Sequence, residues 1–174
     1  GNGFVLSFVE NNLKLTWSFK NLPYIKTEVY SPPIENLLPW VKIVPSYFRF
    51  GSRGNLSTWE AYGDWQYTIN QDLLELTANE KQIVDELIQG VVSNREKAKI
   101  IYYYMQDNTR YINVSIDEGG LIPYPARYVC TNKYGDCKAL TIYMMALLKY
   151  AGIESYYVDV HAGKQAKFID QSLP

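Results

Sequence analysis

The chain has 174 residues, of which 47% are hydrophobic and 20% are charged, and its formal net charge is -1. This composition is typical of a globular protein and excludes a disordered chain, and the near-neutral charge argues against a nucleic-acid partner. No apolar run reaches the roughly 18 residues of a membrane span. The two cysteines are too few for a disulfide scaffold and form no metal-ligand pattern.

The first 54 residues are rich in β-forming residues. Such runs predict strands at 4–10, 13–19, Ile25–Tyr30, Trp40–Val44 and Tyr47–Phe50. The first two runs meet at Asn11-Asn12, and the second alternates apolar and polar residues, which predicts a hairpin with one buried face. The polar, glycine-containing stretch Gly51–Asn55 predicts an irregular break, and we place a domain boundary after residue 54.

Three capping-box sequences open the next part of the chain. Ser57, Thr77 and Ser93 are each followed, three residues later, by a glutamate, and each precedes a periodic apolar segment. We therefore expect these residues to be the N-caps of helices that fill residues 57–108. In the third helix, the core stripe is expected to include Ile100, Tyr103 and Tyr104.

The following segment alternates between extended and turn-forming residues. Tyr111–Ile116 has the composition of a strand, and the chain is expected to turn at 117–120. Pro125 is expected to open a short helix at Ala126–Val129, because proline suits the start of a helix. Near the end of the chain, Glu154–His161 is predicted to be a strand.

The stretch from Tyr134 to Thr141 combines a tight turn, a helix start and a cysteine in the first helical turn. Gly135 is expected to supply backbone freedom, and Asp136 to cap a helix that ends at Gly152. A thiol in the first turn meets free amides and the positive end of the helix dipole, which favour the thiolate. Cys137 is therefore a candidate nucleophile, and a cysteine that only packs in the core is the alternative.

The sequence Gly135-Asp136-Cys137-Lys138, followed by an amphipathic helix and Gly152-Ile153-Glu154, resembles the core of the transglutaminase-like superfamily. Residues 59–65, 108–111 and 119–126 resemble bacterial proteins in which a β-rich domain precedes such a core. The resemblance implies an α+β fold. Residues 1–54 would be the end of a β-sandwich-like domain, and residues 55–174 the helical, N-terminal half of a papain-like core.

The resemblance also implies a Cys-His-Asp triad with Cys137 as its nucleophile. The chain has a single histidine, His161, and the carboxylates that could orient it are Asp159 and Asp170. In the family, however, the catalytic histidine comes one strand later, and its acidic partner lies on the next strand. We therefore expect His161 not to be the base, and both triad partners to lie beyond Pro174. On this expectation the 174-residue chain does not turn over substrate.

The implied function is thiol-dependent acyl transfer on a peptide or amide substrate, as a peptidase, an amidase or a transglutaminase, with hydrolysis favoured. The backbone amide of Cys137 would be one oxyanion donor. Neither a metal ion nor an organic cofactor is implied. The alternative is a non-catalytic binding or adaptor module with a relic cysteine site, to which the 16 Tyr and 4 Trp residues would contribute.

Three further questions stay open at the level of sequence. A disulfide between Cys130 and Cys137 would silence the proposed nucleophile. The oligomeric state is open, because a sheet with missing strands could associate through its unpaired edge. The chain begins at Gly1-Asn2-Gly3 and shows no signal peptide, so export with a signal peptide already removed also stays open.

Overall fold

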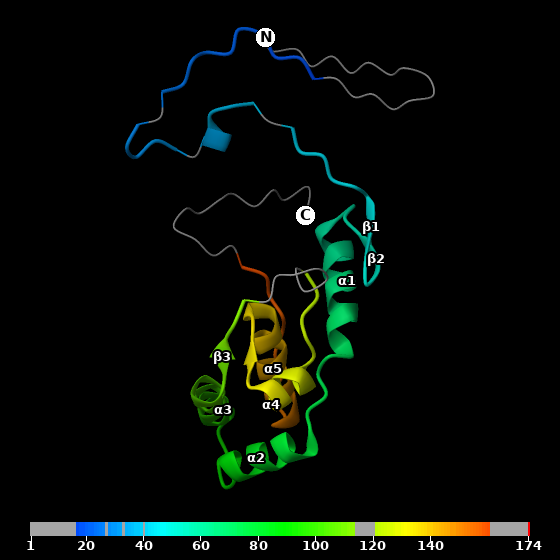
Figure 1. Ribbon diagram of the computed structural model, residues 1–174, viewed down its shortest axis with the longest axis vertical. Coiled ribbons are helices and arrows are strands. Elements are labelled where there is room, and N and C mark those ends of the chain that lie inside the picture. Colours follow the sequence, from blue (N-terminus) through cyan, green and yellow to red (C-terminus); the bar gives the residue numbers. More distant parts are fainter. Residues whose placement is uncertain (1–16, 27, 33, 40, 114–120, 161–173) are drawn as a thin grey trace. The chain divides into compact units, whose positions relative to one another are not determined.

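The computed structural model describes residues 17–26, 28–32, 34–39, 41–113, 121–160 and 174 (Figure 1). The chain divides into two compact units, Gly1–Lys42 and Ile43–Pro174, and each is described by itself. In the described part of the first unit, the one regular element is a short 3-10 helix, η1, at Ile34–Asn36.

The strands predicted for the first unit are not found where the structure describes them. The predicted hairpin lies outside the described residues except for Trp17–Phe19, which form no strand. The strand predicted at Ile25–Tyr30 is wrong, because Ser31 N–H donates to the Glu28 carbonyl at 3.0 Å and closes a turn. Residues 41–44 form no strand either. β-forming composition alone does not make a strand, because a strand is stabilised by the ladder that it forms with a neighbour.

The second unit begins with a β-hairpin. Strand β1 (Tyr47–Phe50), which confirms the prediction, pairs antiparallel with β2 (Ser52–Asn55) through a turn at Gly51, whose φ is +65°. The stretch predicted as an irregular break is therefore this turn and its second strand. Residues 51–55 are mostly polar and mostly exposed, and a linker has the same composition. Composition alone therefore did not distinguish this hairpin from a linker. The predicted domain division after residue 54 stays a prediction.

Three helices follow and confirm the predicted helical region. They are α1 (Trp59–Gln71), α2 (Ala78–Ile88) and α3 (Asn94–Asn108). Thr77 and Ser93 cap α2 and α3 as predicted, and their side chains accept hydrogen bonds from the amides of Glu80 and Glu96. Local sequence therefore defines where these two helices begin.

The predicted N-cap of α1 is wrong by one residue. Thr58, not Ser57, accepts from the amide of Ala61 at 3.1 Å. The amide of Ser57 instead donates to the Asn55 side chain at 2.8 Å, which holds Ser57 in the turn before the helix. Ser57 and Thr58 could each serve as the N-cap, and the hydrogen bond from the Ser57 amide to Asn55 leaves Thr58 as the cap.

The remaining elements surround the candidate nucleophile. Strand β3 (Arg110–Tyr111) pairs in parallel with β4 (Tyr134–Gly135). In the sequence, helix α4 (Ala126–Asn132) lies between these strands, and it begins after Pro125 as predicted. The strand predicted at Tyr111–Ile116 is thus shorter and begins one residue earlier, and its residues 114–116 lie outside the described part, as does the turn predicted at 117–120. Helix α5 (Cys137–Tyr150) ends before Gly152, whose φ is +76°.

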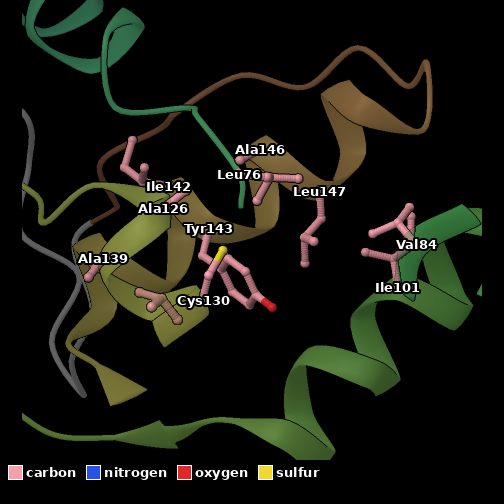
Figure 2. Close-up of a cluster of buried hydrophobic side chains, with 11 residues drawn as sticks. Leu76, Val84, Ile101, Ala126, Cys130, Ala139, Ile142, Tyr143, Ala146 and Leu147 are labelled. Atoms are coloured by element: carbon pink, nitrogen blue, oxygen red, sulfur yellow. The ribbon is translucent and has the colours of Figure 1, made fainter. Parts of the chain in front are cut away.

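Helix α5 is the centre of the core and packs against α2, α3 and α4 (Figures 1 and 2). Its buried residues are Ala139, Ile142, Tyr143, Ala146 and Leu147. From α3 the core takes Ile101, which is 0% exposed, whereas the predicted Tyr103 is 52% exposed and Ile100 is only partly buried. The third predicted residue, Tyr104, is partly buried, so the stripe is rotated from the one expected.

A buried carboxylate joins four elements of this core. Glu80 of α2 is 1% exposed and accepts hydrogen bonds from Tyr104 of α3 at 2.6 Å and from Tyr143 of α5. Lys133, at the end of α4, approaches its other oxygen at 2.8 Å. Burial alone would raise the pKa of Glu80, but these three donors together hold it below its ordinary value. The glutamate of the second capping box is therefore turned inward and pins the helices together.

The segment after α5 is not the predicted strand in its described part, which ends at Val160. Its exposure still alternates as in a strand: Ile153, Ser155 and Tyr157 are partly buried, and the residues between them are exposed. The composition therefore gave the correct two-residue period, but the described residues provide no ladder partner. His161, the last residue of the predicted strand, lies outside the described part.

Candidate active site

The two thiols of the chain differ in exposure. Both cysteines are free, so no disulfide joins them. Cys137 is the first residue of α5 and is exposed. Cys130 of α4 is 7% exposed within the hydrophobic core, where burial raises the pKa of its thiol (Figure 2). Of the two sulfur atoms, only that of Cys137 is accessible to a substrate.

Asp136 fixes the start of the helix that carries Cys137. Its side chain is 2% exposed and caps the helix as predicted, because one carboxylate oxygen accepts from the Ala139 amide at 2.9 Å. The other oxygen lies 2.5 Å from the ammonium of Lys138. Helix geometry leaves the amides of the first turn without intrahelical partners, and the amide of Cys137 is one of these. An oxyanion formed beside the sulfur could accept from this amide.

Gly135 is required for a reason different from the one predicted. Its φ is not positive, so backbone freedom is not needed. A Cβ at this position would instead lie 2.9 Å from the Cβ of Ala139 and 3.4 Å from Val129. The first turn of α5 therefore packs directly onto the backbone of β4, which leaves no room for a side chain at the position two residues before Cys137.

The parallel bridge between β3 and β4 also holds the residues that precede Cys137. The amide of Arg110 donates to the Lys133 carbonyl at 3.0 Å, and that of Ile112 donates to the Gly135 carbonyl at 2.9 Å. These bonds connect the end of α3 to the residues immediately before Cys137. The position of the sulfur thus depends on backbone contacts that are distant in sequence.

Electrostatic interactions connect Tyr157 with Cys137 and Asp159, and connect Tyr62 with Asp159. The pKa of Tyr157 is raised, first by burial and then by the negative charges of Asp159 and the Cys137 thiolate. The pKa of Tyr62 on α1 is raised by burial and by the charge of Asp159. The phenols of Tyr157 and Tyr62 therefore stay protonated at neutral pH.

The predicted site residues are placed as follows. Cys137 is exposed at the helix start, and Asp159 is also exposed and, like Cys137, contributes to the raised pKa of Tyr157. His161 and Asp170 lie outside the described residues, and the described part contains no other histidine. Within the same part, no cluster of acidic, histidine and cysteine side chains could hold a metal ion, and no helix has the length and apolarity to cross a membrane.

The sequence analysis missed Tyr157 and Tyr62. The signal for Tyr157 was present, because it shares the parity of Asp159 in a segment with a two-residue period. No such signal marked Tyr62 of α1, whose pKa is raised by burial and by the charge of Asp159.

Comparison of the sequence with known protein families identifies the family of this region. The family model described as "Transglutaminase-like superfamily" matches residues 81–170, which is more than half of the chain and includes all of α3, α4 and α5. The chain belongs to the transglutaminase-like superfamily. The superfamily region contains Cys137 and its helix, Tyr157 and Asp159, whereas Tyr62 and the β-hairpin precede it.

One solved structure was found to be similar. It is the crystal structure of a "putative protease" from Parabacteroides distasonis ATCC 8503, with 19% sequence identity and a TM-score of 0.43. The similarity covers 50% of this chain and 17% of that protein, so the chain spans only a small part of its length. No curated protein matched the sequence.

Proposed function

We propose that Cys137 is the nucleophile of a thiol-dependent acyl transfer on peptide or amide substrates. The observation that carries the proposal is the exposed sulfur at the first position of α5, within the region that matches the superfamily. An accessible thiol at a helix N-terminus is the setting in which cysteine acts as a nucleophile. The buried Cys130 has neither property.

The proposed chemistry has two steps. The Cys137 thiol gives its proton to the base, the thiolate attacks the substrate carbonyl, and a C–S bond forms. The C–N bond then breaks, and the amine leaves with the proton that the base returns. Water or a second amine then attacks the thioester and frees the sulfur. Attack by water makes the protein a peptidase or an amidase, and attack by an amine makes it a transglutaminase. We favour hydrolysis. The Cys137 amide is proposed as one donor to the oxyanion of both tetrahedral intermediates.

Acylation by an activated ester tests the nucleophile directly. We would incubate the chain with the p-nitrophenyl ester of an acetylated dipeptide and follow the intact mass and the release of nitrophenol. This ester needs no protonated leaving group, so it reports thiol attack alone. We expect one acyl group on Cys137, none in Cys137→Ala, and an unchanged rate in the matched variant Cys130→Ala. Acylation at Cys130, or no acylation, would refute the proposal.

Two additions to this experiment separate the remaining possibilities. A primary amine added in excess shifts the product from free acid to amide if the protein is a transglutaminase. His161→Ala is expected to leave the acylation rate unchanged, because we propose that another residue is the base. A rate that falls in this variant would identify His161 as the base. A binding module with a relic cysteine would give the same slow acylation as a cysteine in an unstructured peptide.

A further inference from the structure

A groove lies along one face of α1, beside the candidate active site. Its α1 lining recurs at helical spacing and includes Gly63, Tyr67 and Asn70. The opposite wall is the end of α5 and the extended segment that follows, and it includes Tyr157, whose pKa is raised by burial and by the charges of Asp159 and Cys137. The volume of the groove is about 580 Å³, which is within the range of small-molecule and peptide pockets. Cys137 itself is not part of the lining.

Asn70 is the feature of this groove that needs an explanation. It is 2% exposed and is the only buried residue of the lining. Neither its side-chain nitrogen nor its side-chain oxygen has a hydrogen-bond partner in the part of the chain that the structure describes. A buried carboxamide without partners is costly, and such groups are rare in folded proteins. A ligand that offers both a donor and an acceptor to Asn70 would remove this cost.

Two other observations indicate that the groove accommodates a ligand. Glycine inside a helix is less stable than alanine, yet a Cβ at Gly63 would meet no atom within 4 Å. Space is therefore open beside the α1 backbone on the groove side. Tyr67 and Tyr156, from the two walls, are 65% and 72% exposed, and the charge of one influences the pKa of the other. Exposed aromatic rings on both sides of a groove supply contact area at low entropic cost.

The chemistry of one carboxamide selects the class of ligand. In an extended peptide, the N–H and C=O of the same residue point to the same side. A single Asn side chain can therefore donate to that C=O and accept from that N–H. The N-acetyl group of an amino sugar has one trans amide, whose N–H and C=O point in opposite directions, so it cannot satisfy both atoms of Asn70.

We infer that this groove binds a segment of extended peptide, with Asn70 paired to the N–H and C=O of one residue. Tyr67 and Tyr156 flank the bound backbone, and Gly63 leaves room for it against α1. That this peptide is part of the acyl substrate of Cys137 rests on the proposed function. Peptide binding itself does not, because it needs no thiol chemistry.

The experiment is a titration with trialanine blocked at both ends, followed by NMR of the side-chain amide of Asn70. The Asn70 signal is assigned by its absence in Asn70→Leu. We expect a saturable shift of this signal in the wild-type chain and in Cys137→Ala. Asn70→Leu should weaken binding at least about tenfold, since two hydrogen bonds are lost, without lowering the thermal midpoint. The matched control Asn79→Leu, at an exposed position of α2, should bind as the wild type does.

Gly63→Ala gives a second readout in which misfolding is not expected. The added methyl group meets no protein atom and favours the helix, so the thermal midpoint should not fall, while peptide binding weakens. An Asn70 signal unmoved by trialanine, equal affinity in Asn70→Leu, or a shift produced by N-acetylglucosamine in place of trialanine would overturn the inference. Peptide binding without acylation would refute the proposed thiol chemistry but not the inferred peptide site. Acylation without peptide binding would refute the peptide site but not the thiol chemistry.

Discussion

Replacement of Glu80 by glutamine should destabilise the second unit strongly although the two side chains have the same shape. The carboxylate is 1% exposed and holds three donors. Both phenols donate to the same oxygen of Glu80, and Tyr143 among them is 0% exposed, so the single oxygen of a glutamine amide would stay with them. The NH₂ group then faces the Lys133 ammonium, which bonds to the other oxygen. The two phenol hydrogen bonds no longer end on a charged group, which costs about 2–3 kcal/mol for the pair. The lost ion pair with Lys133, whose side chain is 39% exposed, adds up to about 1 kcal/mol.

The expected loss for Glu80→Gln is therefore about 2–4 kcal/mol in the free energy of unfolding. Urea unfolding followed by far-UV circular dichroism measures it as a lower midpoint at an unchanged slope. Glu86→Gln, at an exposed position of the same helix, is the matched control and should differ from the wild type by less than about 0.5 kcal/mol. A Glu80→Gln midpoint equal to that of the control would refute the reasoning.

The same carboxylate predicts how stability depends on pH. Because the pKa of Glu80 is lower in the folded state than in the unfolded chain, its contribution is fully present above the ordinary glutamate pKa of about 4.3. The contribution is lost as the pH falls through the lower, folded-state pKa. Wild-type stability should therefore decrease more steeply below pH ~4 than that of Glu80→Gln, and parallel curves would contradict the assignment.

Four other changes test the remaining features. Cys137 should react with iodoacetamide at neutral pH at least tenfold faster than the buried Cys130, and peptide mapping at several times measures both rates. Gly135→Ala should lower the free energy of unfolding by about 1–3 kcal/mol, because the added methyl would lie 2.9 Å from a side chain of α5. Asp136→Ala should cost about 1 kcal/mol more than Asp136→Asn, which keeps the helix cap, in urea unfolding. Asn70→Leu should raise the free energy of unfolding by about 1–3 kcal/mol, since it removes a buried amide without partners, and a loss instead would show that the amide is satisfied.

The sequence predicted best what depends on short-range chemistry. The caps at Thr77, Ser93 and Asp136 follow from a side chain and an amide three residues apart, and all three are found. The place of Cys137 at a helix start follows from the same local pattern, but its exposure does not, because the neighbouring Asp136 is buried. The error at Ser57 has a local cause too, since an adjacent threonine offers an equivalent cap.

Features that depend on contacts between distant residues could not be predicted. Glu80 fits a capping box in sequence, and only the approach of Tyr143 and Lys133 shows why it is buried. Gly135 looked like a flexible turn residue because sequence does not reveal which helix lies against it. Asn70 carries no signal within α1, since its lack of partners is a property of the surrounding walls.

The two-residue bridge between β3 and β4 allows the opening of the helix start to be measured by hydrogen exchange. The amides of Arg110 and Ile112 bond to carbonyls immediately before Cys137, so each exchanges its hydrogen with solvent only when that contact breaks. Deuterium uptake at these two positions therefore counts how often the helix start is released. Hydrogen exchange at Arg110 and Ile112 thus reports how long Cys137 is held at the folded helix start, although both residues are distant from it in sequence and the sulfur carries no label.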